Sequence, residues 1–232
     1  MTLLAQRVKS TGKMGWSRAT VLSPTSRAGL GPALATVDGL GGAIIAWPDD
    51  RTGTMNVYAQ RVNHGGSICW PEGGVPLGAT SASQGSGWKN TLQPDGKGGA
   101  ILMWVGLQSG LPQMYAQRIT RYGGTLWGAG GVRVAPSTNW QQLGTVVARP
   151  DGGAILAWSE FPNGFLAEND LFAAALSRDG TPAWPGGARV VSNASGGQVN
   201  VVGLPDGEGG AFLAWDDFRG LPSGRFALPH VF

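Results

Sequence analysis

A pattern of short apolar segments and glycine turns, repeated four times, constrains the fold of this chain more than any other feature. The motif Gly-Gly-Ala-x-x-x-Trp recurs with spacings of 57, 54 and 57 residues between its tryptophans. Its copies are Gly41–Trp47, Gly98–Trp104, Gly152–Trp158 and Gly209–Trp215. A second motif alternates with it along the chain, at Leu4–Val8, Tyr58–Val62, Tyr115–Ile119 and Phe172–Leu176. Two motifs in a fixed order predict a repeat architecture, in which each unit packs on its neighbours.

Each repeat predicts four short strands. The first precedes an Asp-Gly pair, the second is the Gly-Gly-Ala motif, the third is the Tyr-Ala-Gln-Arg-Val motif, and the fourth carries another tryptophan. All four are rich in β-branched, aromatic and small apolar residues, and turn-forming residues bound them. Asp-Gly pairs favour hairpin turns because both residues accept a positive φ. We expect no long helix, since no window combines a helical apolar period with capping residues.

The second strand is apolar on both faces, which is typical of a sheet that is covered on both sides. Propeller blades are covered in this way, each by two neighbouring blades. The sequence therefore predicts an all-β fold, a β-propeller of about four four-stranded blades in a single domain over residues 1–232. The repeats span about 23–75, 76–135, 136–192, and 193–232 together with 1–22.

The fourth repeat predicts a closing blade made from both termini. Its third strand would be Leu3–Val8, from the start of the chain. However, Phe226–Phe232 also looks like a third strand and competes for the same place. Two alternatives stay open. Either the tail packs elsewhere, or the chain is cut from a longer array, in which case four blades would close only by pairing with a second chain.

The strings Trp47-Pro-Asp-Asp-Arg-Thr-Gly53 and Tyr58-Ala-Gln-Arg-Val-Asn63 resemble those of a large group of bacterial secreted repeat proteins of unknown function. The resemblance covers essentially the whole chain. It implies a β-propeller and an extracellular or cell-surface setting, and it implies no activity. The middle copies depart from the pattern, because the Asp/Arg pair that follows Trp47 is missing after Trp104 and Trp158.

Composition excludes several kinds of partner. The 17 Lys and Arg residues against 14 Asp and Glu residues are scattered, so we expect no nucleic-acid partner. No stretch of 18 apolar residues predicts a membrane span, and no signal peptide begins the chain. A single cysteine, Cys69, and the absence of a Cys/His cluster predict no metal and no cofactor. The remaining partners are an unknown protein or glycan ligand and a possible homodimer that completes the propeller.

Candidate binding residues gather on one predicted face. In a propeller, the loops between second and third strands share a face with the connections between blades. These segments carry Asp50, Arg51, Asp217, Arg219, Trp88 and Trp140. Both tryptophans stand outside the repeat pattern, and an exposed tryptophan beside a carboxylate and an arginine is suited to holding a sugar ring. The alternative is that both tryptophans fill the edges of the core.

The sequence offers no clear catalytic set. Its two histidines, His64 and His230, form no Ser-His-Asp pattern, and the adjacent acids Asp49/Asp50 and Asp216/Asp217 are better explained by pairing with arginine. We therefore expect a non-catalytic binding or scaffold module of a secreted or cell-surface protein, and not an enzyme. Lectin-like glycan binding is the alternative, and a glycoside hydrolase or sialidase-like enzyme is the third hypothesis.

Overall fold

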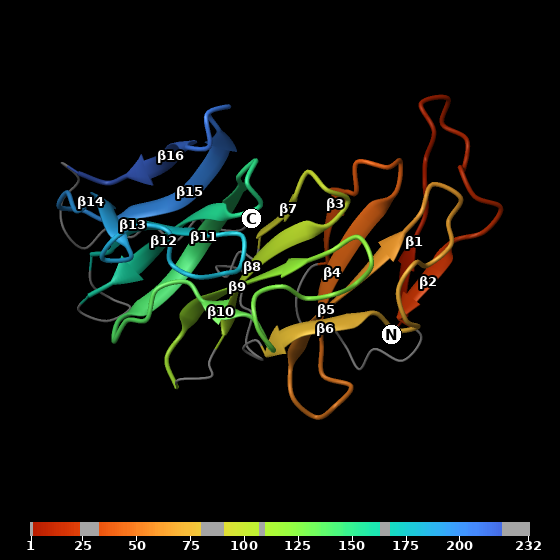
Figure 1. The fold of residues 1–232 in the computed structure, drawn as a ribbon, viewed down its shortest axis with the longest axis horizontal. Helices are drawn as coiled ribbons and strands as arrows, with labels where there is room; N and C mark the ends of the chain where they lie inside the picture. The colour runs from red at the N-terminus through yellow and green to blue at the C-terminus, as the bar shows by residue number, and fades with distance from the viewer. Residues whose placement is uncertain (1, 24–32, 80–90, 107–109, 163–167, 220–232) are drawn as a thin grey trace, which may run out of the picture.

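The computed structural model describes residues 2–23, 33–79, 91–106, 110–162 and 168–219, and it is built of antiparallel sheets (Figure 1). The first blade contains β3 (Leu34–Val37), β4 (Ala43–Asp49), β5 (Asn56–Val62) and β6 (Val75–Ala79). The second blade contains β7 (Thr91–Pro94), β8 (Ala100–Gly106), β9 (Gln113–Ile119) and β10 (Val132–Arg133). The third blade contains β11 (Trp140–Ala148), β12 (Ala154–Phe161), β13 (Asp170–Leu176) and β14 (Arg189–Ser192).

Two further sheets have only two strands each. The N-terminal half-blade, residues 2–23, pairs β1 (Leu3–Ala5) with β2 (Thr20–Ser23). The C-terminal half-blade, residues 193–219, pairs β15 (Gln198–Pro205) with β16 (Ala211–Asp217). By their motifs, β1 and β2 are third and fourth strands, whereas β15 and β16 are first and second strands.

The second and third strands of every complete blade pair in the same register. Trp47 lies opposite Tyr58, and Trp104 lies opposite Tyr115. Their rings stack, with centroids 6.4 Å and 6.1 Å apart. The third blade repeats the arrangement with Trp158 opposite Phe172. The two sequence motifs are therefore the two halves of one cross-strand aromatic pair.

The Asp-Gly hairpins are held by their aspartate. Asp38 accepts hydrogen bonds of 2.8 Å from the backbone N–H groups of Leu40 and Gly42, and Arg61 from the third strand pairs with it at 2.7 Å. Glycine is required at position 42 because a Cβ there would lie 2.3 Å from the carbonyl oxygen of Val62. The Gly-Gly-Ala motif thus lets the hairpin approach the third strand closely.

Neighbouring blades are joined by the tryptophan of the fourth segment. Trp70 donates its Nε1–H to the carbonyl of Arg121 in the next blade at 3.0 Å, and Trp127 donates to Arg178 at 3.1 Å. Trp16 of the N-terminal half-blade repeats the contact with His64 at 2.9 Å. These equivalent bonds fix the way in which each blade packs on the next.

The core lies between the blades. Every residue of β8 and of β12 is buried, as the apolar character of the second strand predicts. One apolar cluster, which includes Trp104 and Ile44, joins the first blade to the second. Another, which includes Trp127 and Trp158, joins the second blade to the third. The all-β propeller-like architecture expected from the sequence is thereby confirmed.

The described sheets form an open array. The predicted closing blade is not formed, because β1–β2 and β15–β16 are separate sheets at opposite ends of the array (Figure 1). Within the described ranges, the first strands of successive blades pack on one another, β3 on β7, β7 on β11 and β11 on β15. Nothing in this packing brings the first and last sheets together. No helix long and apolar enough to cross a membrane occurs in the ranges given above.

Candidate functional site

Two carboxylates face each other at the end of the third blade where β12 ends and β13 begins. Glu160 of β12 lies directly opposite Asp170 of β13. Side chains in directly opposed positions share one face of a sheet, with Cβ atoms about 4.5–5.5 Å apart. Glu168 lies two residues before Asp170 and is exposed. We call Glu160, Glu168 and Asp170 the carboxylate cluster.

Glu160 is buried and held by four donors. Its Oε1 accepts hydrogen bonds from the Ser137 hydroxyl at 2.5 Å and from Asn139 Nδ2 at 2.9 Å. Its Oε2 accepts from Gln141 Nε2 at 2.9 Å and from Trp158 Nε1 at 3.1 Å. Three of these donors come from the connection between the second and third blades and the start of β11. The carboxylate is therefore fixed in position and ties that connection to β12.

Asp170 is half-buried and differs from Glu160 in its electrostatics. Burial raises the pKa of Asp170 above its usual range, and the negative charges of Glu160 and Glu168 raise it further. A carboxyl group whose pKa is raised keeps its proton to a higher pH than a free carboxyl group does. The cluster can therefore supply a proton donor beside a fixed negative charge.

The other blades carry an amide where the third blade carries Asp170. Asn56 lies opposite Asp49 in the first blade, and Gln113 lies opposite Gly106 in the second. Only at the third blade of these three are two acids opposed, and like charges in opposed positions destabilise a sheet. The third blade has two opposed acids at a position where the other two blades have a neutral amide. A departure of this kind, which lowers stability, is characteristic of a functional site.

Trp140, predicted from the sequence as a binding residue, lies on β11, the strand next to the one that carries Glu160. It opens β11, is half-buried, and pairs with Phe161, which follows Glu160 in β12. It follows Asn139, which binds Glu160. Because neighbouring residues of a strand point to opposite faces of a sheet, the Trp140 side chain lies on the face opposite to that of Glu160 and Asp170. Trp88, the other predicted tryptophan, lies outside the described residues.

Arg51 is held on several sides by groups of the first blade and of the N-terminal half-blade. It pairs with Asp49 at 2.5 Å, donates to Ser23 and to the Gly73 carbonyl at 2.9 Å each, and lies 4.1 Å from the centre of the Tyr58 ring. Burial alone would raise the pKa of Asp49, but the hydrogen bonds from Arg51 outweigh it and hold the pKa below its usual range. The acid that pairs with Arg51 is Asp49, which is fully buried, and not its neighbour Asp50.

Asp217 and Arg219 form the same turn at the other end of the array. Their side chains pair at 2.7 Å, and Trp215 donates to Asp217 at 3.2 Å. The hydrogen bonds from Arg219 hold the pKa of Asp217 well below its usual range. This pair follows β16, whereas Asp50 and Arg51 follow β4 in the first blade, so the array does not bring the two predicted pairs together (Figure 1). A binding role for these four residues stays a prediction.

The position of Glu160 within the repeat could have identified it from the sequence. It stands two residues after Trp158, where Asp49 stands after Trp47 and Asp217 after Trp215, and all three accept a hydrogen bond from that tryptophan. Asp170 becomes noticeable only when the register with β12 is known. For metal binding, no group of three or more His, Cys, Asp and Glu side chains suited to hold an ion occurs in the part of the chain that the structure describes.

No protein-family model matches this sequence, and no curated protein matches it. Solved structures of β-propeller glycoside hydrolases do resemble its fold. An α-L-arabinanase of Penicillium chrysogenum, complexed with arabinobiose, matches with a TM-score of 0.53 and 12% identity over 92% of this chain and 67% of its own. An α-L-arabinofuranosidase of Fusarium graminearum, also with arabinobiose, matches with a TM-score of 0.51 and 12% identity over 91% and 66%. The chain thus spans about two thirds of the length of these proteins.

These comparisons correct the function expected from the sequence. The prediction of a non-catalytic binding or scaffold module is wrong, because the structures that the chain resembles are arabinanases and arabinofuranosidases, which are enzymes. The prediction was based on the repeat motifs, which consist of strand and turn residues, and it gave little weight to the few acids that depart from them. The resemblance to secreted repeat proteins is confirmed only at the level of a propeller-like fold.

Proposed function

We propose that the chain forms the catalytic part of a glycoside hydrolase that acts on arabinose-containing oligosaccharides or polysaccharides. Asp170 is the proton donor to the glycosidic oxygen, and Glu168 is the second carboxylate, which activates water or attacks the sugar. Glycoside hydrolysis ordinarily requires such a pair of carboxyl groups flanking the bond that breaks. Glu160 is a positioning residue, which keeps Asp170 protonated and anchors the loop that carries Trp140.

The observation that carries this proposal is the opposed pair Glu160 and Asp170. The pKa of Asp170 is raised by burial and by two neighbouring acids, as a general acid that works near neutral pH requires. Asp170 is half-buried, so part of this residue is open to solvent.

The substrate class comes from the fold comparison. The two proteins with TM-scores above 0.5 are an arabinanase and an arabinofuranosidase, each described with arabinobiose. Because identity is only 12%, arabinose specificity is part of the proposal and is the first property to test. We also propose an extracellular location, since polymeric arabinan is too large to cross a cell membrane intact.

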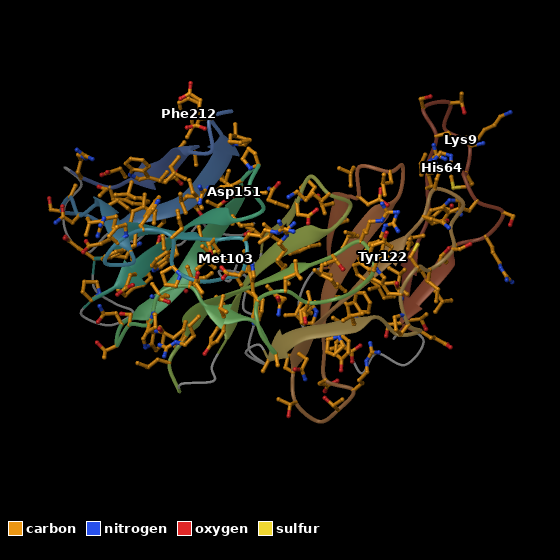
Figure 2. The ribbon with its side chains drawn as sticks, in the orientation of Figure 1. Lys9, His64, Met103, Tyr122, Asp151 and Phe212 are labelled. Carbon is orange, nitrogen blue, oxygen red and sulfur yellow. The ribbon has the colours of Figure 1, made fainter. Side chains whose placement is uncertain are left out.

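The test measures release of reducing sugar from linear arabinan and from short arabino-oligosaccharides. Asp170→Asn should lower turnover by about 10²–10⁴-fold, the usual contribution of a general acid. Glu168→Gln should lower turnover as well. Glu160→Gln should shift the alkaline limb of the pH profile to lower pH, because it removes a negative charge that raises the pKa of Asp170. The matched control is Asp151→Asn, in the hairpin at the opposite end of the third blade (Figure 2), which should leave turnover unchanged.

Two results would reject the proposal. One is a folded wild-type chain that releases no sugar from any arabinose-containing substrate. The other is full turnover by the Asp170→Asn variant. Loss of turnover in Asp50→Asn or Asp217→Asn, with Asp170→Asn active, would move the site to the residues predicted from the sequence.

A further inference from the structure

We infer that the C-terminal half-blade of one copy joins the N-terminal half-blade of a second copy, so that the chain associates with itself head to tail. The joint would be a complete four-stranded blade with strands β15 and β16 from one copy and β1 and β2 from the other. This inference does not depend on the proposed function.

The two half-blades are complementary parts of the same unit. In all three complete blades the second strand pairs with the third, as β4 with β5, β8 with β9 and β12 with β13. Among the described residues, β16 is a second strand paired only with β15, and β1 is a third strand paired only with β2. The repeat register places Trp215 opposite Leu4 of the second copy, as Trp47 lies opposite Tyr58. Adding a strand to an open sheet edge satisfies backbone groups on both sides.

Both half-blades expose apolar side chains whose equivalents are buried elsewhere. Phe212 is 70% exposed, whereas its equivalents Ile44 and Ile101 are each 0% exposed. Leu4 is 53% exposed, whereas its equivalent Tyr58 is 6% exposed. In the complete blades an adjacent blade covers these positions. The joint would supply the missing blade to each half-blade at once.

The half-blades also carry opposite charges. The N-terminal half-blade has four basic residues and no acidic residue: Arg7, Lys9, Lys13 and Arg18. The C-terminal half-blade has four acidic residues and one basic residue: Asp206, Glu208, Asp216, Asp217 and Arg219. Opposite charges on two surfaces favour their association and orient them. Two copies of either half-blade would instead repel each other, so the arrangement is head to tail.

One specific ion pair is incomplete in the single chain. The hairpin aspartate pairs with an arginine of the third strand in the first two blades, Asp38 with Arg61 at 2.7 Å and Asp95 with Arg118 at 2.9 Å. The equivalent hairpin aspartate of the last blade is Asp206, which is exposed and accepts hydrogen bonds from the backbone N–H groups of Glu208 and Gly210 in its own turn. The equivalent arginine is Arg7, at the other end of the array.

A single chain cannot make this joint with itself in the observed arrangement. The labelled residues Lys9 and Phe212 mark the two half-blades at opposite ends of the molecule in Figure 2. Arg7 binds His64 instead, at 2.7 Å. A second copy brings Arg7 to Asp206 without changing the packing of the three complete blades.

The experiment is a charge exchange read by light scattering after size exclusion. The wild-type chain should elute at twice the 24.0 kDa of one copy, or at higher multiples if the ring stays open. Arg7→Asp and Asp206→Arg should each weaken association at least tenfold, because each opposes two like charges in the joint. An equimolar mixture of the two variants should associate again, since both joints then pair opposite charges.

The control is Arg178→Asp, an exposed change of the same charge outside both half-blades, which should associate like the wild type. Circular dichroism shows whether each variant is folded, and Phe212→Glu replaces any variant that is not. A wild-type monomer at tens of micromolar would overturn the inference, as would variants that associate like the wild type or a mixture that does not recover.

Discussion

The opposed acids of the third blade predict that Asp170→Asn stabilises the fold while it removes activity. The folded-state pKa of Asp170 is raised by burial and by Glu160 and Glu168, so its ionised form destabilises the native state. The contribution of protonated Asp170 to stability is present below the unfolded pKa of about 3.9 and is lost as the pH rises through the folded value. Asparagine removes this loss, because it is neutral at every pH.

The size of the effect follows from the geometry. A pair of like charges in opposed positions on a sheet changes stability by about 0.2–1 kcal/mol. For a chain of this length, 1 kcal/mol shifts the melting temperature by about 2–4 °C. We therefore expect Asp170→Asn to melt up to about 4 °C above the wild type at pH 7.5, and the two melting temperatures to converge near pH 4.

The assay is thermal unfolding followed by tryptophan fluorescence across this pH range. The mirror variant is Asn56→Asp, which places a second acid opposite Asp49 in the first blade and should lower the melting temperature at pH 7.5. If Asp170→Asn melts below the wild type at pH 7.5, or if the difference does not depend on pH, the electrostatic reasoning about the cluster is wrong.

Three further predictions concern the scaffold. Asp95→Ala should cost about 3–5 kcal/mol of stability in chemical denaturation, because it leaves the buried Arg118 without its partner charge. Gly180→Ala should lower the melting temperature, since this residue has a φ of 85° and an added Cβ would lie 2.7 Å from the ring of Trp127. The control is Gly12→Ala, which has a similar φ but open space around the added Cβ, and it should lower the melting temperature less. The pKa of Asp49 is lowered in the native state, so ionised Asp49 stabilises the fold above its unfolded pKa, and this contribution is lost as the pH falls. The melting temperature of Asp49→Asn should therefore depend less on pH than that of the wild type below pH of about 4.

Much of the scaffold could be predicted from the repeat alone. The spacing of 11 residues between Trp47 and Tyr58, and again between Trp104 and Tyr115, already contains the register that the structure shows. The Asp-Gly pairs marked the hairpins because their chemistry acts locally, through backbone N–H groups two and four residues away.

The candidate site could not be predicted in the same way, because it depends on contacts between strands and between blades. Glu160 becomes a fixed carboxylate only when the connection at Ser137 and Asn139 folds against it. Asp170 acquires its raised pKa only from the acid that the register places opposite it. Likewise, the adjacent acids Asp49 and Asp50 look equivalent in the sequence. Only the structure shows that Asp49, the last residue of β4, is the one that pairs with Arg51.

The sequence by itself therefore determined the strands, their turns and their order, since these follow from local periodicity and backbone preferences. Only the tertiary structure decided which acids meet and whether the ends of the array meet. The relative positions of distant side chains are set by how successive blades pack, and no single repeat contains that information. The two unpaired half-blades are the clearest case: the repeat predicted that they match, and the packing of the three blades between them keeps them apart.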